Sequence, residues 1–251
     1  MAFKLLTPIK DYFLGLLFPI RCVVCKKETE RKRKNKLICT DCLKELSPSL
    51  NFYCPLCEAR TADAKLCFSF DLILNNTQNK FYLDRLIYPF SYKDQPVQKV
   101  IKAFKYHFIK DLKKTIGRLL INYLEKVKKQ IDLKDLILIP VPLHKRKFNQ
   151  RGYNQSELIA EQIISCFEKS EILADVLKKE RSTKDQASLE NDERIKNIEG
   201  VFKYTEPEKI LGKKVLLIDD VYTTGATMAE CAKVSKEAGA KEVIGLAIAR
   251  G

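Results

Sequence analysis

The sequence predicts an α/β fold with a mainly parallel sheet, preceded by a small cysteine-rich module. Strand-like and helix-like segments alternate from Leu136 to the C-terminus, which is typical of parallel sheets. Within this part, the apolar run Val215–Ile218 is typical of a buried strand, and a helical pattern follows from Ala226. Near the N-terminus, seven of the nine cysteines lie between Cys22 and Cys67.

The chain of 251 residues is long enough for one α/β core and a small additional module. We predict three parts: an amphipathic helix within residues 1–20, the cysteine-rich module at 21–72 and the α/β domain at 81–251. Within the domain, the patterns predict strands at 85–92, 136–143, 172–177, 201–204, 215–219 and 243–249. They predict helices at 95–107, 110–128, 153–167 and 226–237.

The N-terminal segment contains an apolar stretch, Tyr12–Ile20, that is too short to span a bilayer. No small-residue cleavage site follows it, so we expect neither a membrane span nor a secretory signal. An amphipathic helix from about Leu5 to Leu17 would pack on the rest of the protein or lie on a membrane surface. We therefore expect a cytoplasmic protein, and the sequence does not define its oligomeric state.

Two cysteine pairs, Cys22-x2-Cys25 and Cys39-x2-Cys42, are separated by thirteen residues. Each pair would present two thiolates to one ion, so the spacing predicts a tetrahedral, structural Zn²⁺ site. A disulfide framework is the alternative, and the absence of a secretory signal argues against it.

A second group contains Cys54, Cys57 and Cys67, but Phe70 stands where a fourth cysteine is expected. Asp63 or Asp71 would supply an oxygen ligand in its place, or the second site no longer binds metal. The two groups together predict a double zinc-ribbon-like module.

Two acidic residues, Asp219 and Asp220, follow the apolar run Val215–Ile218 and lie at the carboxyl end of the predicted strand. A loop of small residues comes next: Thr223, Thr224, Gly225, Ala226 and Thr227. Ligands of open α/β sheets bind at the carboxyl ends of strands. The loop would offer N–H and hydroxyl groups to a phosphate, and the carboxylates would hold sugar hydroxyls. The pattern suits a ribose 5-phosphate; the alternative is a turn whose polar residues only cap the helix.

Two further segments are rich in polar residues. An apolar strand ends in Pro140-Val141-Pro142 and is followed by the cations Lys145, Arg146, Lys147 and Arg151, which form either an anion site or a basic surface turn. Residues 181–198 form a long polar connection between two predicted strands. Such connections are usually functional, and the alternative is a solvated linker.

Residues 215–227 resemble the phosphoribosyl-pyrophosphate (PRPP) loop of type I phosphoribosyltransferases, in which two acids, a short variable segment and Thr-Gly-x-Thr follow a strand. The segment from Val141-Pro142 to Arg151-Gly-Tyr-Asn-Gln155 resembles the ComF family, with Tyr153 in place of the usual Phe. The polar connection resembles the corresponding segment of ComF proteins in Arg181, Thr183, Gln186, Leu189, Arg194 and Asn197. The order of the segments along the chain also resembles that of ComF proteins.

This resemblance implies a Rossmann-like type I phosphoribosyltransferase fold with an N-terminal zinc-ribbon module. It implies that Asp219 and Asp220 are the catalytic acids and hold the ribose hydroxyls of PRPP, directly or through Mg²⁺. Residues 223–227 would bind the 5-phosphate. The implied pyrophosphate contacts are Lys145, Arg146 and Arg151, and the implied residues of a closing flexible loop are Arg181, Gln186 and Arg194.

The net charge of +14 indicates an anionic partner or a solubilising surface. The basic run Arg31–Lys36 would contact nucleic-acid phosphates, or it is a solvated loop. The resemblance implies binding of PRPP and single-stranded DNA and a role in DNA uptake during natural transformation. The alternatives are a non-catalytic PRPP-sensing or nucleic-acid-binding module and a nucleobase-salvage phosphoribosyltransferase. The residues do not define the acceptor substrate.

Overall fold

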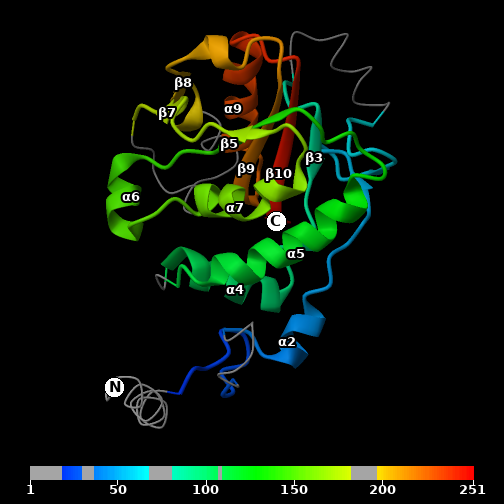
Figure 1. Cartoon of the computed structure of the whole chain (residues 1–251), viewed down its shortest axis with the longest axis vertical. Helices are drawn as coiled ribbons and strands as arrows, with labels where there is room; N and C mark the ends of the chain where they lie inside the picture. Colours follow the sequence, from blue (N-terminus) through cyan, green and yellow to red (C-terminus); the bar gives the residue numbers. More distant parts are fainter. Residues whose placement is uncertain (1–18, 30–36, 68–80, 107–108, 182–196) are drawn as a thin grey trace, which may run out of the picture.

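The computed structural model describes residues 19–29, 37–67, 81–106, 109–181 and 197–251. Its centre is a sheet in which every strand pair is parallel, with the order β3-β10-β9-β5-β6 and with β4 also paired to β10 (Figure 1). The strands are β3 (Arg85–Ile87), β4 (Phe90–Ser91), β5 (Leu136–Pro140), β6 (Glu171–Ile172), β9 (Lys214–Tyr222) and β10 (Glu242–Arg250).

The two faces of the sheet are covered by different elements, because successive side chains of a strand point to opposite faces. Leu216 and Ile218 pack in one core with α4, α5 and α7, whereas Val215 and Leu217 pack in a second core with α9 and β8. The helices are α4 (Gln95–Tyr106), α5 (Leu112–Val127), α7 (Gln155–Ile163) and α9 (Ala226–Glu237). The continuous apolar run in β9 is explained by this burial on both sides.

Shorter elements complete the fold. An antiparallel pair, β7 (Leu177–Lys179) and β8 (Phe202–Tyr204), lies on the α9 side. The helical segments α6 (Lys145–Arg151), η1 (Ile164–Cys166) and η3 (Pro207–Lys209) connect strands and helices. The cysteine-rich part contains α2 (Thr40–Glu45) and an antiparallel pair, β1 (Phe52–Tyr53) and β2 (Arg60–Thr61).

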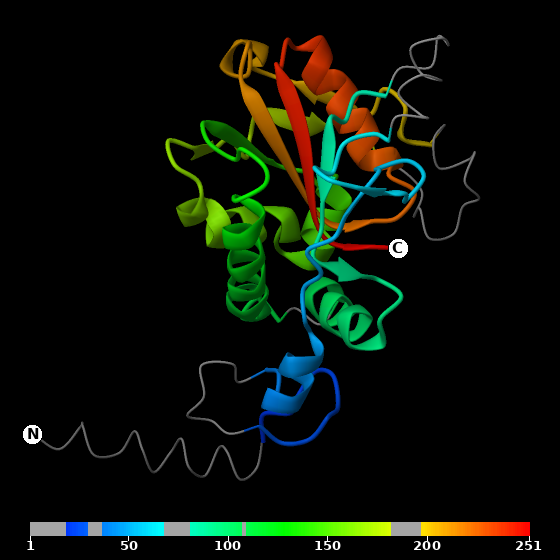
Figure 2. The ribbon, with the colours of Figure 1, turned by 90° about the vertical axis from the view of Figure 1, so that its right-hand side faces the viewer.

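The cysteine-rich part lies against the domain at two places. Figure 2 shows the cyan β1–β2 segment beside β3 and the red β10, whereas the blue segment that includes α2 lies at the bottom, beyond α4. The two cysteine groups therefore have different neighbours.

Several of the sequence-based element predictions are wrong in detail. The strand predicted at 85–92 is interrupted after Ile87 and forms the two short strands β3 and β4. The strand predicted at 172–177 is divided, because Ile172 continues the main sheet beside β5 while Leu177 pairs with β8. Residues 145–151, predicted as a basic loop, form the helix α6. Strand β9 extends through Asp219 and Asp220 to Tyr222, so that the two acids belong to the strand itself. The predicted N-terminal helix lies outside the described residues.

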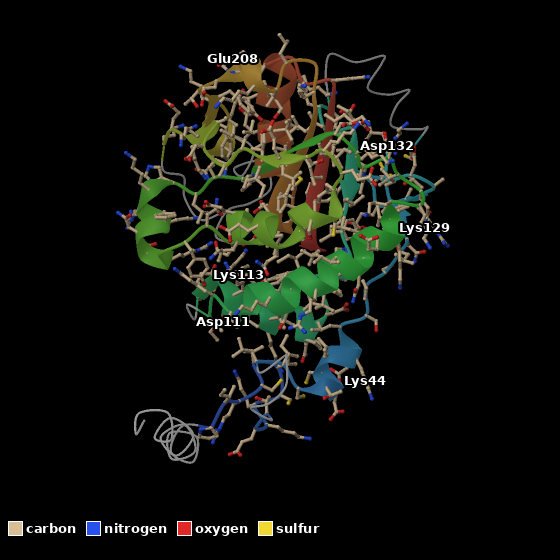
Figure 3. All side chains as sticks on the ribbon, viewed as in Figure 1. Lys44, Asp111, Lys113, Lys129, Asp132 and Glu208 are labelled. Atoms are coloured by element: carbon tan, nitrogen blue, oxygen red, sulfur yellow. The ribbon has the colours of Figure 1, made fainter. Side chains whose placement is uncertain are left out.

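Charged side chains cover the outer surface, and several of them join neighbouring elements (Figure 3). Lys113 of α5 pairs with Glu161 of α7 at 3.1 Å, and Lys214 of β9 pairs with Asp132 at 2.6 Å. Exposed pairs of this kind contribute at most about 1 kcal/mol each. None of the described helices is long and apolar enough to cross a membrane.

Candidate functional site

A cavity of about 550 Å³ lies where β5 and β9 end. Its lining comes from β9 and the loop that follows it, helix α4, the turn after β5, helix α6, the start of α7, β7, and Tyr92 after β4. Its charged lining residues are Lys102, Lys105, Lys147, Arg151, Lys179, Asp219 and Asp220. The cavity is therefore predominantly basic around two carboxylates, which suits an anionic ligand that also carries hydroxyl groups.

The two carboxylates differ in their surroundings because they are successive strand residues. Asp220 is buried, and its Oδ1 lies 2.9 Å from Nζ of Lys105 in α4. Asp219 remains partly open to the cavity, and its Oδ1 accepts hydrogen bonds from the backbone N–H of Asp220 and, at 3.4 Å, from the hydroxyl of Ser156. Asp219 is thus the carboxylate that is more available to a ligand.

The electrostatics of Asp219 favour the arrival of a cation or a hydroxyl donor. Burial and the nearby charge of Asp220 raise the pKa of Asp219 to about 7, against the opposing charge of Lys105. An additional positive charge would relieve this repulsion. Carboxylate oxygens are the ligands that Mg²⁺ prefers, so the donor set of Asp219 and Asp220 fits that ion.

The loop after β9 has a backbone that only glycine accommodates at its centre. Gly225 has φ +79°, and a Cβ atom there would lie 2.2 Å from the hydroxyl oxygen of Tyr222. Helix α9 begins at the next residue, Ala226, so its first-turn N–H groups adjoin the loop. Thr223, Gly225 and Thr227 border a small pocket next to Asp219, and this pocket shares Thr223 and Thr227 with the cavity. The Thr224 hydroxyl faces Ala226 N–H at 3.5 Å.

The predicted pyrophosphate cations do not all reach the cavity. Arg151 lines it, but Lys145 and Arg146 are exposed on α6 and do not belong to the lining, in which Lys147 stands instead. Arg151 is oriented by a 3.1 Å hydrogen bond to Gln155 and lies over the ring of Tyr106 at 5.3 Å.

Lys179 lies on β7 and is a cavity residue that sequence reasoning missed. Burial and, second, the charge of Lys147 lower its pKa to about 8. An anionic ligand would restore its full charge.

Lys102 and Lys105 of α4 were also missed. The apolar positions Val97, Val100, Ile101 and Phe104 predicted this helix, and the two lysines lie outside that apolar stripe. That pattern was available in the sequence, but only the tertiary packing of α4 brings the lysines to the cavity.

The predicted flexible loop is described only at its ends. Arg181 donates a 2.8 Å hydrogen bond to the carbonyl of Glu199, and Glu230 of α9 accepts the N–H of Gly200 at 2.8 Å. Gln186 and Arg194 lie outside the described residues, as do Phe70, Asp71 and the basic run Arg31–Lys36.

The first cysteine group has the geometry of a zinc site. The sulfur atoms of Cys22, Cys25, Cys39 and Cys42 lie within 4.8 Å of one another, and those of Cys25 and Cys39 are 3.7 Å apart. Tetrahedral Zn²⁺ with Zn–S bonds of about 2.3 Å requires S–S separations of about 3.8 Å. Burial opposes ionisation of Cys22, but backbone N–H groups of Cys25, Cys39 and Val24 outweigh it and lower its pKa to about 7. These four thiols fit structural zinc.

The second group brings three thiols together. Cys54, Cys57 and Cys67 have their sulfur atoms within 4.8 Å, with 3.5 Å between Cys57 and Cys67. Asp63, one of the two predicted substitutes for a fourth cysteine, does not join them. Its carboxylate lies 3.1 Å from Arg85 and 3.4 Å from Lys65.

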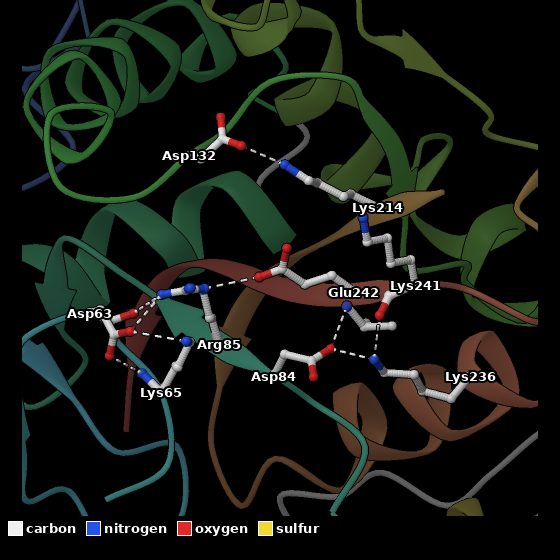
Figure 4. Close-up of polar contacts among 10 residues, drawn as sticks. Asp63, Lys65, Asp84, Arg85, Asp132, Lys214, Lys236, Lys241 and Glu242 are labelled. Carbon is white, nitrogen blue, oxygen red and sulfur yellow. Dashed lines mark hydrogen bonds and ion pairs between the residues drawn. The ribbon is translucent and has the colours of Figure 1, made fainter. Parts of the chain in front are cut away.

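Arg85 fastens the second cysteine group to the sheet. It donates to the backbone carbonyl of Asp63 at 2.6 Å, and its Nε lies 3.0 Å from Glu242 at the start of β10 (Figure 4). Below it, Asp84 accepts the N–H of Val243 and pairs with Lys236 at 2.7 Å. This cluster ties the ribbon, β3, β10 and α9 into one unit.

Comparison with known proteins agrees with this architecture. Residues 153–250 match the family model of the phosphoribosyl transferase domain, and residues 13–70 match that of the double zinc ribbon domain. The chain is 26% identical over 228 residues to competence protein F of Haemophilus influenzae, and the aligned residues are 90% of this chain and 95% of that protein. It is 24% identical over 234 residues to competence protein ComFC of Bacillus subtilis, with coverage of 90% and 92%. The chain is a ComF-like protein.

A third relative matches this ComF-like protein over a shorter length. DNA utilization protein YhgH of Escherichia coli K12 is 29% identical over 153 residues, which are 59% of this chain and 64% of that protein.

The ComF-like segment Arg151–Gln155 joins the cavity to the core. Asn154 caps α7 by accepting the N–H of Ser156, and its amide donates to the carbonyl of Val141 at 3.1 Å. Tyr153, which stands where Phe is usual, donates its hydroxyl to the carbonyl of Phe104 at 2.6 Å. The segment therefore holds α7, α4 and the turn after β5 in register around the cavity.

Proposed function

We propose that this ComF-like protein binds PRPP together with Mg²⁺ in the cavity at the end of β9 and acts on single-stranded DNA in DNA uptake. The observation that carries the proposal is the convergence on one cavity of two carboxylates, a glycine-centred loop before a helix, and a wall of cations. PRPP has the matching groups: two ribose hydroxyls, a 5-phosphate and a pyrophosphate.

Each part of the cavity would have a separate task. Asp219 would accept the ribose hydroxyls or hold Mg²⁺, while Asp220 keeps Lys105 in place beside it. The loop 223–227 and the start of α9 would bind the 5-phosphate. Arg151, Lys147 and Lys179 would stabilise the negative charge of pyrophosphate. Bound Mg²⁺ would neutralise part of that same charge.

Transfer chemistry would break the bond between C1 of the ribose and pyrophosphate and form a bond from C1 to the acceptor. The transition state has the positive character of an oxocarbenium ion, as in glycoside cleavage. The cations of the cavity would stabilise the departing pyrophosphate, and the exclusion of water would prevent hydrolysis. A protein that binds PRPP without transfer would use the same contacts and release no pyrophosphate.

Helix α6 offers a surface for DNA outside the cavity. None of its residues is buried, and it carries Lys145, Arg146 and the exposed ring of Phe148. Lysine and arginine neutralise backbone phosphates, and exposed aromatic rings stack on bases, without dependence on sequence. The names of the relatives, two competence proteins and a DNA utilization protein, support a partner of this class.

A competition experiment tests the proposal. A labelled single-stranded oligonucleotide is titrated with the protein at several salt concentrations, with and without saturating Mg²⁺–PRPP, and its fluorescence anisotropy is followed. We expect binding that weakens steeply as salt rises. Pyrophosphate release, measured in the same mixtures and with a panel of free bases, separates transfer from binding alone. Absence of binding to both PRPP and DNA would contradict the proposal.

A further inference from the structure

The second cysteine group contacts the end of the PRPP-type loop directly. Tyr222, the last residue of β9, is buried and donates its hydroxyl to the backbone carbonyl of Pro55 at 3.2 Å. Pro55 stands between the two thiols of the Cys54–Cys57 knuckle. The contact therefore joins the metal-type knuckle to the strand that carries Asp219 and Asp220.

Arg250, at the end of β10, makes a second connection to the same knuckle. Its guanidinium donates to the carbonyl of Cys54 at 3.0 Å and to that of Pro55 at 3.2 Å. The group is buried, lies over the ring of Tyr222 at 5.3 Å, and has Nε 3.3 Å from Glu58. The planar guanidinium of Arg250 thus contacts two backbone carbonyls of the knuckle and the face of the Tyr222 ring at the same time.

The ring of Tyr222 in turn supports the loop. A Cβ atom at Gly225 would lie 2.2 Å from the Tyr222 hydroxyl oxygen and 2.4 Å from the adjacent ring carbon. The loop backbone therefore rests on the tyrosine side chain, in the space that any other residue at position 225 would fill. A displacement of Tyr222 would move the loop that precedes α9.

We propose that Tyr222 and Arg250 are positioning residues through which the Cys54–Cys57 knuckle holds the loop 223–227 in place. As a consequence, metal in this knuckle and a phosphoribosyl ligand in the cavity bind cooperatively. The inference rests on the proposed function, because it takes PRPP as the ligand of the loop. An ordered knuckle presents the carbonyls of Cys54 and Pro55 in fixed positions, and a ligand-ordered loop fixes Tyr222 against them. Coupling between two binding sites is reciprocal, so each ligand raises the affinity for the other by the same factor.

The first arm of the test uses the tyrosine. Tyr222→Phe removes the hydroxyl that reaches Pro55 and keeps the ring under Gly225. Loss of one such hydrogen bond corresponds to a Kd for Mg²⁺–PRPP that is about fivefold weaker in calorimetry. Tyr204→Phe is the matched control, because it removes a buried tyrosine hydroxyl that contacts Ser235 at 2.8 Å in the other core. We expect its Kd to stay within about twofold of the wild type.

The second arm measures the same coupling through the effect of PRPP on zinc release. Zinc transfer from the full chain to a chromogenic chelator is followed with and without saturating Mg²⁺–PRPP. We expect PRPP to slow the release of one zinc equivalent in the wild type and to lose most of that effect in Tyr222→Phe. Cys57→Ser removes an exposed thiol of the knuckle and should weaken PRPP binding without any change in the cavity lining. If this variant does not fold, PRPP binding by Tyr222→Phe and the rates of zinc release to the chelator test the proposal.

The outcomes separate the two proposals. If the wild type binds no PRPP, the proposed function fails and the coupling fails with it. If the wild type binds PRPP but Tyr222→Phe binds it equally well and PRPP leaves zinc release unchanged, only the coupling is overturned. Weaker PRPP binding in Tyr222→Phe together with ligand-protected zinc supports it.

Discussion

Lys105 Nζ lies 2.9 Å from Asp220 Oδ1, and both side chains are largely shielded from solvent. Burial disfavours the lysine charge, but the charge of Asp220 and the hydrogen bond outweigh it and raise the pKa of Lys105. Two adjacent carboxylates at a strand end would otherwise repel each other. Lys105 is therefore the internal counterion that lets the acidic pair persist in the absence of a ligand.

Removal of this counterion should destabilise the protein. Lys105→Met leaves Asp220 buried without its partner, which costs about 3 kcal/mol at pH 7.5 by comparison with other broken buried pairs. Urea unfolding measures the loss. Lys99→Met is the matched control, because Lys99 is exposed on the same helix, and its effect should stay within about 0.5 kcal/mol. Equal stability of the two variants would contradict the counterion role.

Asp219 should make stability depend on pH. Its pKa is raised to about 7 in the folded protein, so the folded state binds this proton more tightly than the unfolded state. The sign follows from proton linkage: the group favours folding at low pH, and this contribution is lost as pH rises through about 4 to 7. Asp219→Asn should therefore become increasingly stabilising over that range and level off above it. A stability difference that is the same at pH 5 and pH 8 would contradict the shift.

Zinc should account for much of the stability of the N-terminal module. We expect purified protein to contain between one and two zinc equivalents by elemental analysis, at least one of them held by Cys22, Cys25, Cys39 and Cys42. A strong chelator should unfold the module, because so short a ribbon has little core of its own. Metal-free protein whose module resists proteolysis as well as the zinc-loaded form would rule this out.

The α6 surface should bind DNA separately from the cavity. Lys145→Ser with Arg146→Ser should weaken oligonucleotide binding about equally for different sequences. The slope of the logarithm of the binding constant against the logarithm of the salt concentration should become shallower by up to about two. Arg151→Gln, which changes a cavity residue instead, should weaken PRPP binding more strongly than the double variant does. A double variant with an unchanged salt slope would exclude α6 as the DNA surface.

The sequence was most informative where local pattern decides structure. The apolar positions of 95–107 predicted α4 to within one residue, and the boundaries of α9 at Ala226 and Glu237 were predicted correctly. The motif from Asp219 to Thr227 was also recognisable as one unit, because its residues are contiguous. The cysteine spacing also predicted correctly which thiols lie close together in the structure.

Contacts between distant segments could not be predicted in the same way. Nothing near Lys105 or Lys179 in the chain indicates that these side chains line the same cavity as Asp219 and Asp220, since tertiary packing alone brings them there. Residues 172–177 are apolar enough for one strand, yet their ends pair with different sheets. Tyr222 occupied a variable position of the motif, and its contact with Pro55 spans 167 residues.

Calorimetric titration of Mg²⁺–PRPP tests the central claim most directly. At pH 8, where Asp219 is ionised in the wild type, we expect saturable binding at one site per chain. Asp219→Asn with Asp220→Asn should weaken that binding by at least about tenfold, which corresponds to 1.4 kcal/mol or more. Circular dichroism should show the same fold in both proteins. Equal affinities in two folded proteins, or no binding by the wild type, would contradict the assignment of this cavity to PRPP.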